Sequence, residues 1–185
     1  MKKDLLIIGA GQYGLVAKET AELMNVFGSI DFLDDINENA IGKVSDYKLF
    51  VGKYNYAFVA VGNPEFRLKK AQDLEEAGYI LATLIHPDGF VSPSAEIHNG
   101  SIIEVHAVVS SASIVSRCCI VSAGAIINHN STLKEGCHVD CGAVVCSNSV
   151  VPEKYKVNCG QVFNTYVNPL KFNSNLVFNN LKIGG

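Results

Sequence analysis

The chain has 185 residues, which is enough for one domain or for two small ones. A net charge of -3 and no cluster of lysine and arginine in the sequence argue against nucleic acid as a partner. The longest apolar runs fall well short of the roughly 20 residues that span a bilayer, so we expect no membrane insertion and a cytoplasmic location.

Residues 1–86 predict a small α/β domain. We expect strands over residues 4–9, 29–33, 57–62 and 79–85, and helices over residues 14–25 and 65–77. The apolar side chains at helical spacing in the first helix are Leu15, Ala17, Ala21, Leu23 and Met24. Strands that alternate with helices indicate a parallel sheet with right-handed crossovers, which is about half of a Rossmann-like fold.

A strict period of six residues starts at Val91. Thirteen positions counted by six are all large and apolar: Val91, Ile97, Ile103, Val109, Val115, Val121, Ile127, Leu133, Val139, Val145, Val151, Val157 and Phe163. The position four residues after each is small from Ala95 to Ser149. Three hexads of one strand and one turn each close a triangular coil, so the pattern predicts a left-handed parallel β-helix over residues 87–168.

An antiparallel β-sandwich is the competing interpretation of so many short strands. It predicts a two-residue alternation with turns at irregular intervals, which the unbroken six-residue register contradicts. The tail, residues 169–185, ends the pattern, and we expect it to cap the open end of the β-helix or to reach a neighbouring subunit.

The six cysteines lie between Cys118 and Cys159 and form no CxxC pair. A structural zinc site needs paired ligands at fixed spacing, so we expect no metal here. Small buried residues in a reducing compartment are the favoured interpretation.

The segment Gly9–Gly14 (GAGQYG) follows the first strand and opens the first helix. Its glycines permit a tight turn, and a helix N-terminus attracts phosphate; alternatively, they only allow the strand and helix to pack closely. Asp34 ends the second strand, where an acidic side chain can bond a ribose or a base. The roughly 85 residues before the hexads are too few for a dinucleotide fold, which favours a mononucleotide ligand over NAD.

Several motifs follow one another in a fixed order along the chain: Gly9–Gly14, Phe32–Asp35, Val61–Asn63, Arg67, Ile85–Pro87, Ile127–Asn130 and Cys137–Ala143. In this order the sequence resembles the bacterial hexapeptide-repeat family of sugar O- and N-acetyltransferases. That family includes the sialic-acid O-acetyltransferases and the enzymes that acetylate 4-amino-sugar nucleotides. The resemblance covers the chain up to about residue 168.

The resemblance implies acetyl-CoA as co-substrate, a nucleotide-sugar or sugar as acceptor, and a homotrimer with active sites between adjacent β-helices. It places the catalytic histidine at His129, with Asn130 in place of the family's acidic neighbour, and a second histidine at His138. The implied cofactor contacts are Gly142, Ser147 and Asn148; relatives tend to have glycine where Ser147 stands, one coil beyond His129. The implied contacts to the acceptor are Gly9, Gly11, Tyr13, Gly14, Asp34, Asp35, Asn63 and Arg67.

Acetyl transfer from a thioester needs an acceptor that loses a proton, and histidine, with an ordinary pKa of about 6.5, suits the role of base. We expect His129 as general base. His138 lies half a coil further on, so it contacts the thioester or acceptor from an adjacent subunit. The expected acceptor is the amino group of a nucleotide-linked amino-sugar. Two alternatives remain, O-acetylation of sialic acid or another sugar, and a non-catalytic β-helix that binds or scaffolds.

Overall fold

The structure is a computed structural model that describes residues 3–165. Its N-terminal part contains a four-stranded parallel sheet of order β2-β1-β3-β4, two α-helices and a 3₁₀ helix. These elements are β1 (Lys3–Ile8), α1 (Gln12–Leu23), β2 (Phe27–Leu33), η1 (Val44–Phe50), β3 (Tyr56–Val59), α2 (Pro64–Glu76) and β4 (Ile80–Leu81). Among the described residues, no helix is long and apolar enough to cross a membrane.

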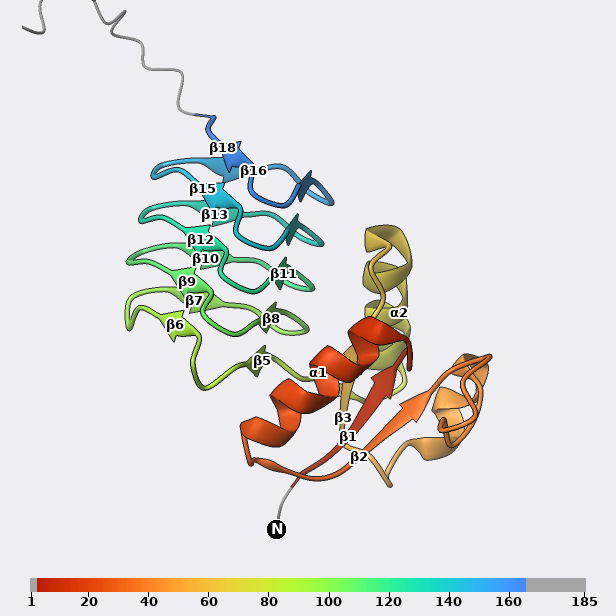
Figure 1. Ribbon diagram of the computed structural model, residues 1–185. Helices are drawn as coiled ribbons and strands as arrows, with labels where there is room; N and C mark the ends of the chain where they lie inside the picture. The colour runs from red at the N-terminus through yellow and green to blue at the C-terminus, as the bar shows by residue number, and fades with distance from the viewer. Residues whose placement is uncertain (1–2, 166–185) are drawn as a thin grey trace, which may run out of the picture.

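The two helices cover opposite faces of the sheet (Figure 1). Alternate side chains of β1 divide between them, because successive residues of a strand point to opposite faces. Leu5 and Ile7 join the core with α1, whereas Leu6 and Ile8 join the core with α2. The sheet is therefore buried on both sides, as its continuous apolar strands predict.

Helix α1 buries part of the expected apolar set: Ala17 and Ala21 are buried, whereas the larger Leu15 and Leu23 are not. Its buried residues are Gly14, Ala17, Thr20 and Ala21, whereas Leu15 is 53% and Leu23 is 56% exposed. Small side chains face the core because α1 is packed between the sheet and the first coils of the β-helix, where Ala17 and Ala21 share a cluster with Leu84 and Ile102 (Figure 1). Close approach on two sides leaves no room for leucine there.

The second part is a β-helix of two-residue strands. They are β5 (Leu84–Ile85), β6 (Phe90–Val91), β7 (Glu96–Ile97), β8 (Ile102–Ile103), β9 (Val108–Val109), β10 (Ile114–Val115), β11 (Ile120–Val121), β12 (Ile126–Ile127), β13 (Thr132–Leu133), β14 (His138–Val139), β15 (Val144–Val145), β16 (Val150–Val151), β17 (Lys156–Val157) and β18 (Val162–Phe163). All pair in parallel with partners 18 residues apart, as Ile114 does with Thr132. The predicted fold class, a half-Rossmann-like domain followed by a left-handed β-helix, is confirmed.

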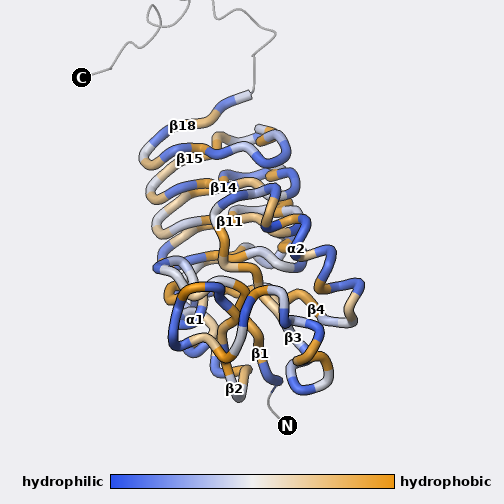
Figure 2. Tube along the Cα trace, turned by 90° about the vertical axis from the view of Figure 1, so that its right-hand side faces the viewer, coloured by the Kyte–Doolittle hydropathy of each residue, from blue (hydrophilic) through white to orange (hydrophobic). Residues whose placement is uncertain are grey.

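The strands form three faces. We call β7-β10-β13-β16 face 1, β5-β8-β11-β14-β17 face 2, and β6-β9-β12-β15-β18 face 3. The second residue of nearly every strand points inward, and apolar and polar segments alternate along each coil (Figure 2). The serines at the small position are also interior, and their hydroxyls are satisfied by carbonyls of the next turn, as when Ser113 Oγ donates to the Asn128 oxygen at 2.8 Å.

The expected strand over 79–85 is two strands in two different sheets. β4 pairs with β3 at the edge of the α/β sheet, and β5 pairs with β8 as the first strand of face 2. The chain thus passes directly from one part to the other. The expected capping tail, residues 169–185, lies outside the described residues.

Candidate active site

A hollow of about 490 Å³ lies at the carboxyl ends of β1, β2 and β3. It is lined by Gly9, Asp34, Asp35, Ile36, Val44, Val61, Asn63 and Phe66. The strand order changes direction here, since the chain passes from β1 to β2 on one side and then to β3 on the other. Ligands of open parallel sheets bind at such a switch point.

The three glycines of the loop after β1 have different environments. Gly9 has a φ of +102° and Gly14 lies so close to the loop that an added Cβ would stand 2.2 Å from the Gly9 oxygen. Both are therefore required by close packing. Gly11, at the N-cap of α1, faces open space, with nothing within 4 Å of an added Cβ. Of the three, Gly11 is the one whose backbone a ligand can approach.

The Asp34 carboxylate ties the two loops of the hollow together. It accepts hydrogen bonds from the backbone N–H groups of Ala10 (2.8 Å), Ile36 (2.9 Å) and Asn37 (2.9 Å). These backbone donors, Ala10 first, lower the pKa of Asp34. Asp35 is exposed and accepts from the Val44 N–H at 3.0 Å. Asp34 thus builds the rim of the hollow, and Asp35 remains closer to solvent.

Asn63 and Arg67 both lie at the start of α2 but contact different parts of the molecule. Asn63 is the N-cap of α2, accepts from the Phe66 N–H at 2.8 Å and lines the hollow. Arg67 is only 1% exposed, and its guanidinium donates to the carbonyls of Cys118, Val61, Gly62 and Gly136 at 2.8–3.0 Å. Its position fits a residue that joins the two parts of the chain better than one that holds a ligand.

His129 lies on an exposed turn between face 3 and face 1. Asn130 follows in the left-handed region with φ of 58°, and its side-chain nitrogen lies 3.1 Å from His129 Nδ1. Rotation of the amide by 180° would put its oxygen there instead, where it can accept from Nδ1–H and leave Nε2 unprotonated. Ser147 and Asn148 stack one coil beyond, and the Asn148 N–H donates to the His129 carbonyl at 3.1 Å.

His138 occupies a different side of the β-helix. Its strand β14 belongs to face 2, where it interrupts a column of Ile102 and Ile120 and precedes Lys156. Burial lowers the pKa of His138 to about 4, so the imidazole is neutral at pH 7. Its Nε2 lies 3.1 Å from Ser122 Oγ and 3.8 Å from Asp140 Oδ1.

The Asp140 carboxylate pairs with Lys156 at 2.8 Å, and this hydrogen bond lowers the pKa of Asp140. Gly142, the third expected cofactor contact, is exposed on the turn between face 2 and face 3 with φ of 63°. It therefore lies on the same edge as His138, not with Ser147 and Asn148.

Sequence reasoning missed two residues near His138, Glu104 and Ser122. Glu104 is only 8% exposed, and its Oε2 accepts from the Ala123 N–H at 3.0 Å. Burial raises the pKa of Glu104, and the hydrogen bond from the Ala123 N–H opposes that shift. Counting by 18 places Glu104, Ser122 and Asp140 in one column after the strands of face 2, which is the signal that could have found them.

Tyr13 reaches this column from α1. Its hydroxyl is buried against the Glu104 carboxyl but makes no well-aligned hydrogen bond to any described residue. Burial raises the pKa of Tyr13 well above its ordinary value. The expected contact of Tyr13 with an acceptor remains a prediction, since this hydroxyl points into the junction of the two parts.

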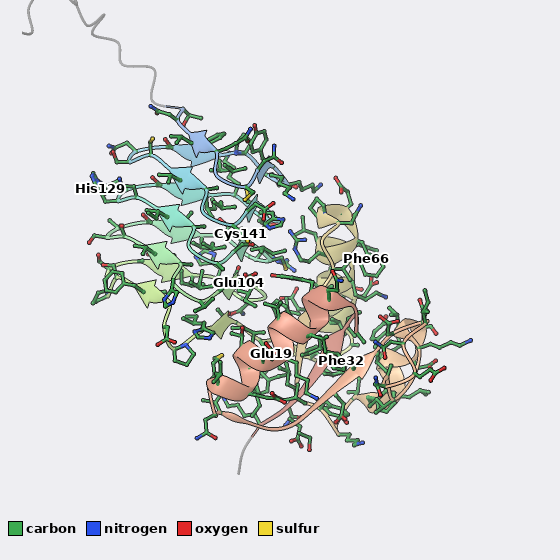
Figure 3. All side chains as sticks on the ribbon, viewed as in Figure 1. Glu19, Phe32, Phe66, Glu104, His129 and Cys141 are labelled. Atoms are coloured by element: carbon green, nitrogen blue, oxygen red, sulfur yellow. The ribbon has the colours of Figure 1, made fainter. Side chains whose placement is uncertain are left out.

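Within one chain the two histidines do not meet. Figure 3 shows His129 at the outer edge of the β-helix and Glu104 with Cys141, three residues after His138, on the side that faces the helices. A site that uses both histidines must therefore combine two chains.

Comparison with known proteins agrees with this architecture. A family model described as the PglD N-terminal domain matches residues 4–74. The acetyltransferase domain of PglB from Neisseria gonorrhoeae FA1090 is 32% identical, with 87% of this chain and 82% of that chain covered and a TM-score of 0.84. The same domain has also been solved in complex with acetyl coenzyme A. PerB from Caulobacter crescentus, solved with CoA and GDP-perosamine, shares the fold at 18% identity and a TM-score of 0.66, over 87% of this chain and 91% of that one.

A nucleotide-type α/β domain joined to a hexapeptide β-helix defines an acyltransferase of the hexapeptide-repeat class. The chain belongs to the family of hexapeptide-repeat acetyltransferases that includes the PglB acetyltransferase domain. The resemblance expected from the sequence is confirmed, and so is the expected enzyme class. Acetyl-CoA, the expected co-substrate, is the one bound in the solved relative.

Proposed function

We propose that the protein transfers an acetyl group from acetyl-CoA to the amino group of a nucleotide-linked amino-sugar, with His129 as general base at a subunit interface. The observation that carries the proposal is the combination of an open hollow at the switch point of the α/β sheet with an exposed histidine on the β-helix. The 32% identity with an acetyltransferase domain supports the reaction.

The hollow suits the nucleotide part of the acceptor. Gly11 presents the uncapped N-terminus of α1, whose dipole and free N–H groups favour phosphate. Ile36 is 93% and Phe66 is 40% exposed beside the hollow, and they offer apolar surface to a base. The Asp35 carboxylate, close to solvent, can accept hydrogen bonds from a ribose or a base edge.

Face 3 supports an assembly of copies. Its outward residues are Phe90, Val108, Ile126, Val144 and Val162, of which Phe90 is 57%, Ile126 is 39% and Val162 is 68% exposed. A continuous apolar stripe of this kind on a soluble chain marks an interaction surface. His129 lies at one border of face 3 and Gly142 at the other. Rotational packing of three copies brings unlike borders together, so His129 of one copy faces the His138 edge of the next.

The steps of the proposed acetyl transfer follow from the positions of these residues. The amino nitrogen of the sugar attacks the thioester carbonyl carbon, and a C–N bond forms as the carbonyl oxygen takes up negative charge. His129 Nε2 takes the proton that the amine loses. The backbone N–H at Ser147 is the proposed donor to the oxyanion. The oxyanion then re-forms the C=O bond as the C–S bond breaks, and the sulfur takes the proton that His129 accepted, so that CoA leaves as a thiol.

The test is an assay of CoA thiol release from acetyl-CoA with a panel of amino-sugar nucleotides and the corresponding free sugars. We expect turnover with one nucleotide-linked amino-sugar and a loss of about 10²–10⁴-fold in kcat for His129→Ala. His98→Ala, an exposed histidine on face 1, is the matched control and keeps full activity. Equal rates for His129→Ala and wild type would remove His129 as the base, and turnover of a hydroxyl acceptor alone would replace N- by O-acetylation.

A further inference from the structure

Two cysteines, Cys141 and Cys159, are exposed, although the sequence favoured buried thiols. Both lie in turns that join face 2 to face 3, on successive coils of the β-helix. Each is followed by a glycine in the left-handed region, Gly142 with φ of 63° and Gly160 with φ of 67°. The Gly160 N–H donates to the Cys141 carbonyl at 3.0 Å. The two turns therefore have the same shape, and one stacks directly on the other.

The strands on either side of these turns keep the two cysteines in register. Val139 pairs with Val157 before the turns, and Val144 pairs with Val162 after them. Paired strands lie about 4.8 Å apart, so the cysteine Cα atoms have about the same separation. Disulfides form between Cα atoms roughly 4.4–6.8 Å apart. The stacking of the coils thus places the two thiols within bonding range.

Formation of the bond draws the two turns slightly together. The Cβ atoms of a disulfide are about 3.8 Å apart, which is closer than the spacing of the coils. The turns have room for this movement, because nothing lies within 4 Å of a Cβ added at Gly142 or at Gly160. The interior of the β-helix does not have to move with them, since both side chains are on the outside.

The other thiols are buried or have no cysteine one coil away. The buried ones are Cys118, Cys119 and Cys137. Cys119 and Cys137 stack on successive coils as well, but a solute cannot reach them in the folded protein. Cys146 is half-buried, and the positions 18 residues before and after it are Asn128 and Asn164. Exposure and stacking are combined only at Cys141 and Cys159.

We propose that Cys141 and Cys159 are a redox modification site, which forms a reversible disulfide by exchange with a low-molecular-weight disulfide. One protein thiolate attacks a sulfur of the small disulfide, whose S–S bond breaks and releases one small thiol. The second protein thiolate attacks the protein sulfur of this mixed disulfide and displaces the second small thiol. The two protein thiols lose two electrons and two protons, and the small disulfide gains both.

The disulfide fastens the last described coil to the coil before it. Among residues 3–165, β16, β17 and β18 are the end strands of the three sheets, so the coil that carries Cys159 stacks on described residues on one side only. The bond closes a loop of one coil and reduces the freedom of the unfolded chain. Oxidation therefore stabilises this end of the β-helix, and reduction releases it.

The experiment incubates the reduced, purified protein with excess oxidised glutathione at pH 8.5. Burial raises the pKa of the Cys141 thiol, and the carboxylates of Asp140 and Glu104 add to that shift, so an alkaline pH supplies more of the attacking thiolate. The remaining thiols are alkylated, and the intact mass and the peptide map are measured. We expect one disulfide per chain, between Cys141 and Cys159, which dithiothreitol removes. The bond raises Tm by roughly 6–12 °C.

The test variants are Cys141→Ser and Cys159→Ser. Each leaves one exposed thiol, so it takes up glutathione as a mixed disulfide and shows no rise in Tm on oxidation. Cys146→Ser is the matched control, and it forms the same internal disulfide as wild type.

Three results overturn the proposal: glutathione carried separately by both cysteines of wild type, a disulfide between two chains, or thiols that stay free at pH 8.5. None of these measurements needs turnover. They therefore decide this inference whether or not the proposed acetyl transfer is confirmed.

Discussion

His138 shows how one polar residue in an apolar column changes the pH dependence of stability. Burial is the main cause of its low pKa, about 4; Asp140 raises that pKa, and Lys156 and Arg67 lower it further. The unfolded chain has an ordinary histidine pKa of about 6.5. Between these values the unfolded state binds the extra proton, so stability falls as the pH drops from about 6.5 toward 4.

We therefore expect His138 to remove about 2 kcal/mol of stability between pH 7.5 and pH 5. The measurement is urea unfolding of wild type and His138→Gln at both pH values, with protein concentration fixed. The variant should lose less stability than wild type by about that amount. His98→Gln, whose side chain is half exposed, should behave as wild type. Parallel pH dependence in wild type and His138→Gln would show that the ring is not buried as described.

At the scale of elements, Arg67 joins α2 to the β-helix. Its guanidinium bridges carbonyls of the α/β part, Val61 and Gly62, to carbonyls of two coils, Cys118 and Gly136. Burial lowers the pKa of Arg67, and no carboxylate pairs with it among the described residues. Among the described residues, only carbonyl dipoles offset the charge of Arg67. The buried charge is therefore stabilised only while its hydrogen bonds to these carbonyls are all kept.

Arg67→Met keeps an unbranched apolar stem but leaves four carbonyls without their donor, and the bonds to two of them, Cys118 and Gly136, are buried. We expect a loss of about 3 kcal/mol in unfolding free energy, which for a chain of this size lowers Tm by roughly 6–12 °C. Differential scanning calorimetry measures it. Lys69→Met on the exposed side of α2 is the control and should not change Tm measurably. A Tm unchanged by Arg67→Met would mean that the two parts are held by their apolar contacts alone.

The loop after β1 offers a second test at this scale. One of its glycines, Gly14, is required for packing, whereas Gly11 is open to a ligand. Gly14→Ala places a methyl against the Gly9 carbonyl, a clash of backbone that the structure relieves only by moving α1. We expect a loss of about 2–4 kcal/mol in stability. Gly11→Ala meets open space and an ordinary φ of -74°, so its Tm should match wild type.

If the N-terminus of α1 holds phosphate, Gly11→Ala crowds the ligand and raises the Kd for the nucleotide-sugar about tenfold or more. Isothermal titration calorimetry on the stable variant decides this. Equal affinity for wild type and Gly11→Ala would place the phosphate elsewhere and leave all three glycines to packing.

These elements also show where sequence reasoning succeeds and where it stops. The six-residue period determines the β-helix because every coil repeats the same inward position, so Val115, Leu133 and Val151 stack from their spacing alone. In α1, helical periodicity correctly predicts that Ala17 is buried but wrongly adds Leu15, because the space between two packed surfaces admits only small side chains. Arg67 and Glu104 escaped for a similar reason. Their partners Cys118, Gly136 and Ala123 lie 19–69 residues away, where no local pattern reveals them.

At the scale of the whole molecule, His129 and His138 lie on different sides of the β-helix. An active site that uses both must therefore be formed between two copies. One chain presents His129 at the border between faces 3 and 1, and His138 on face 2. If the active site is built between copies, each site takes His129 from one copy and His138 from its neighbour. Two inactive variants can then repair each other.

We expect His129→Ala and His138→Ala, mixed as unfolded chains in equal amounts and refolded together, to recover about a quarter of wild-type activity, because random assembly gives that share of interfaces two intact histidines. Each variant refolded alone stays inactive. The measurement is CoA release, with native mass spectrometry to verify mixed trimers. Ile126→Lys, which places a charge on face 3, should yield monomers and abolish the recovery. Mixed trimers with no recovered activity would mean that each site takes both histidines from one copy, and activity in either variant alone would mean that the replaced histidine is dispensable.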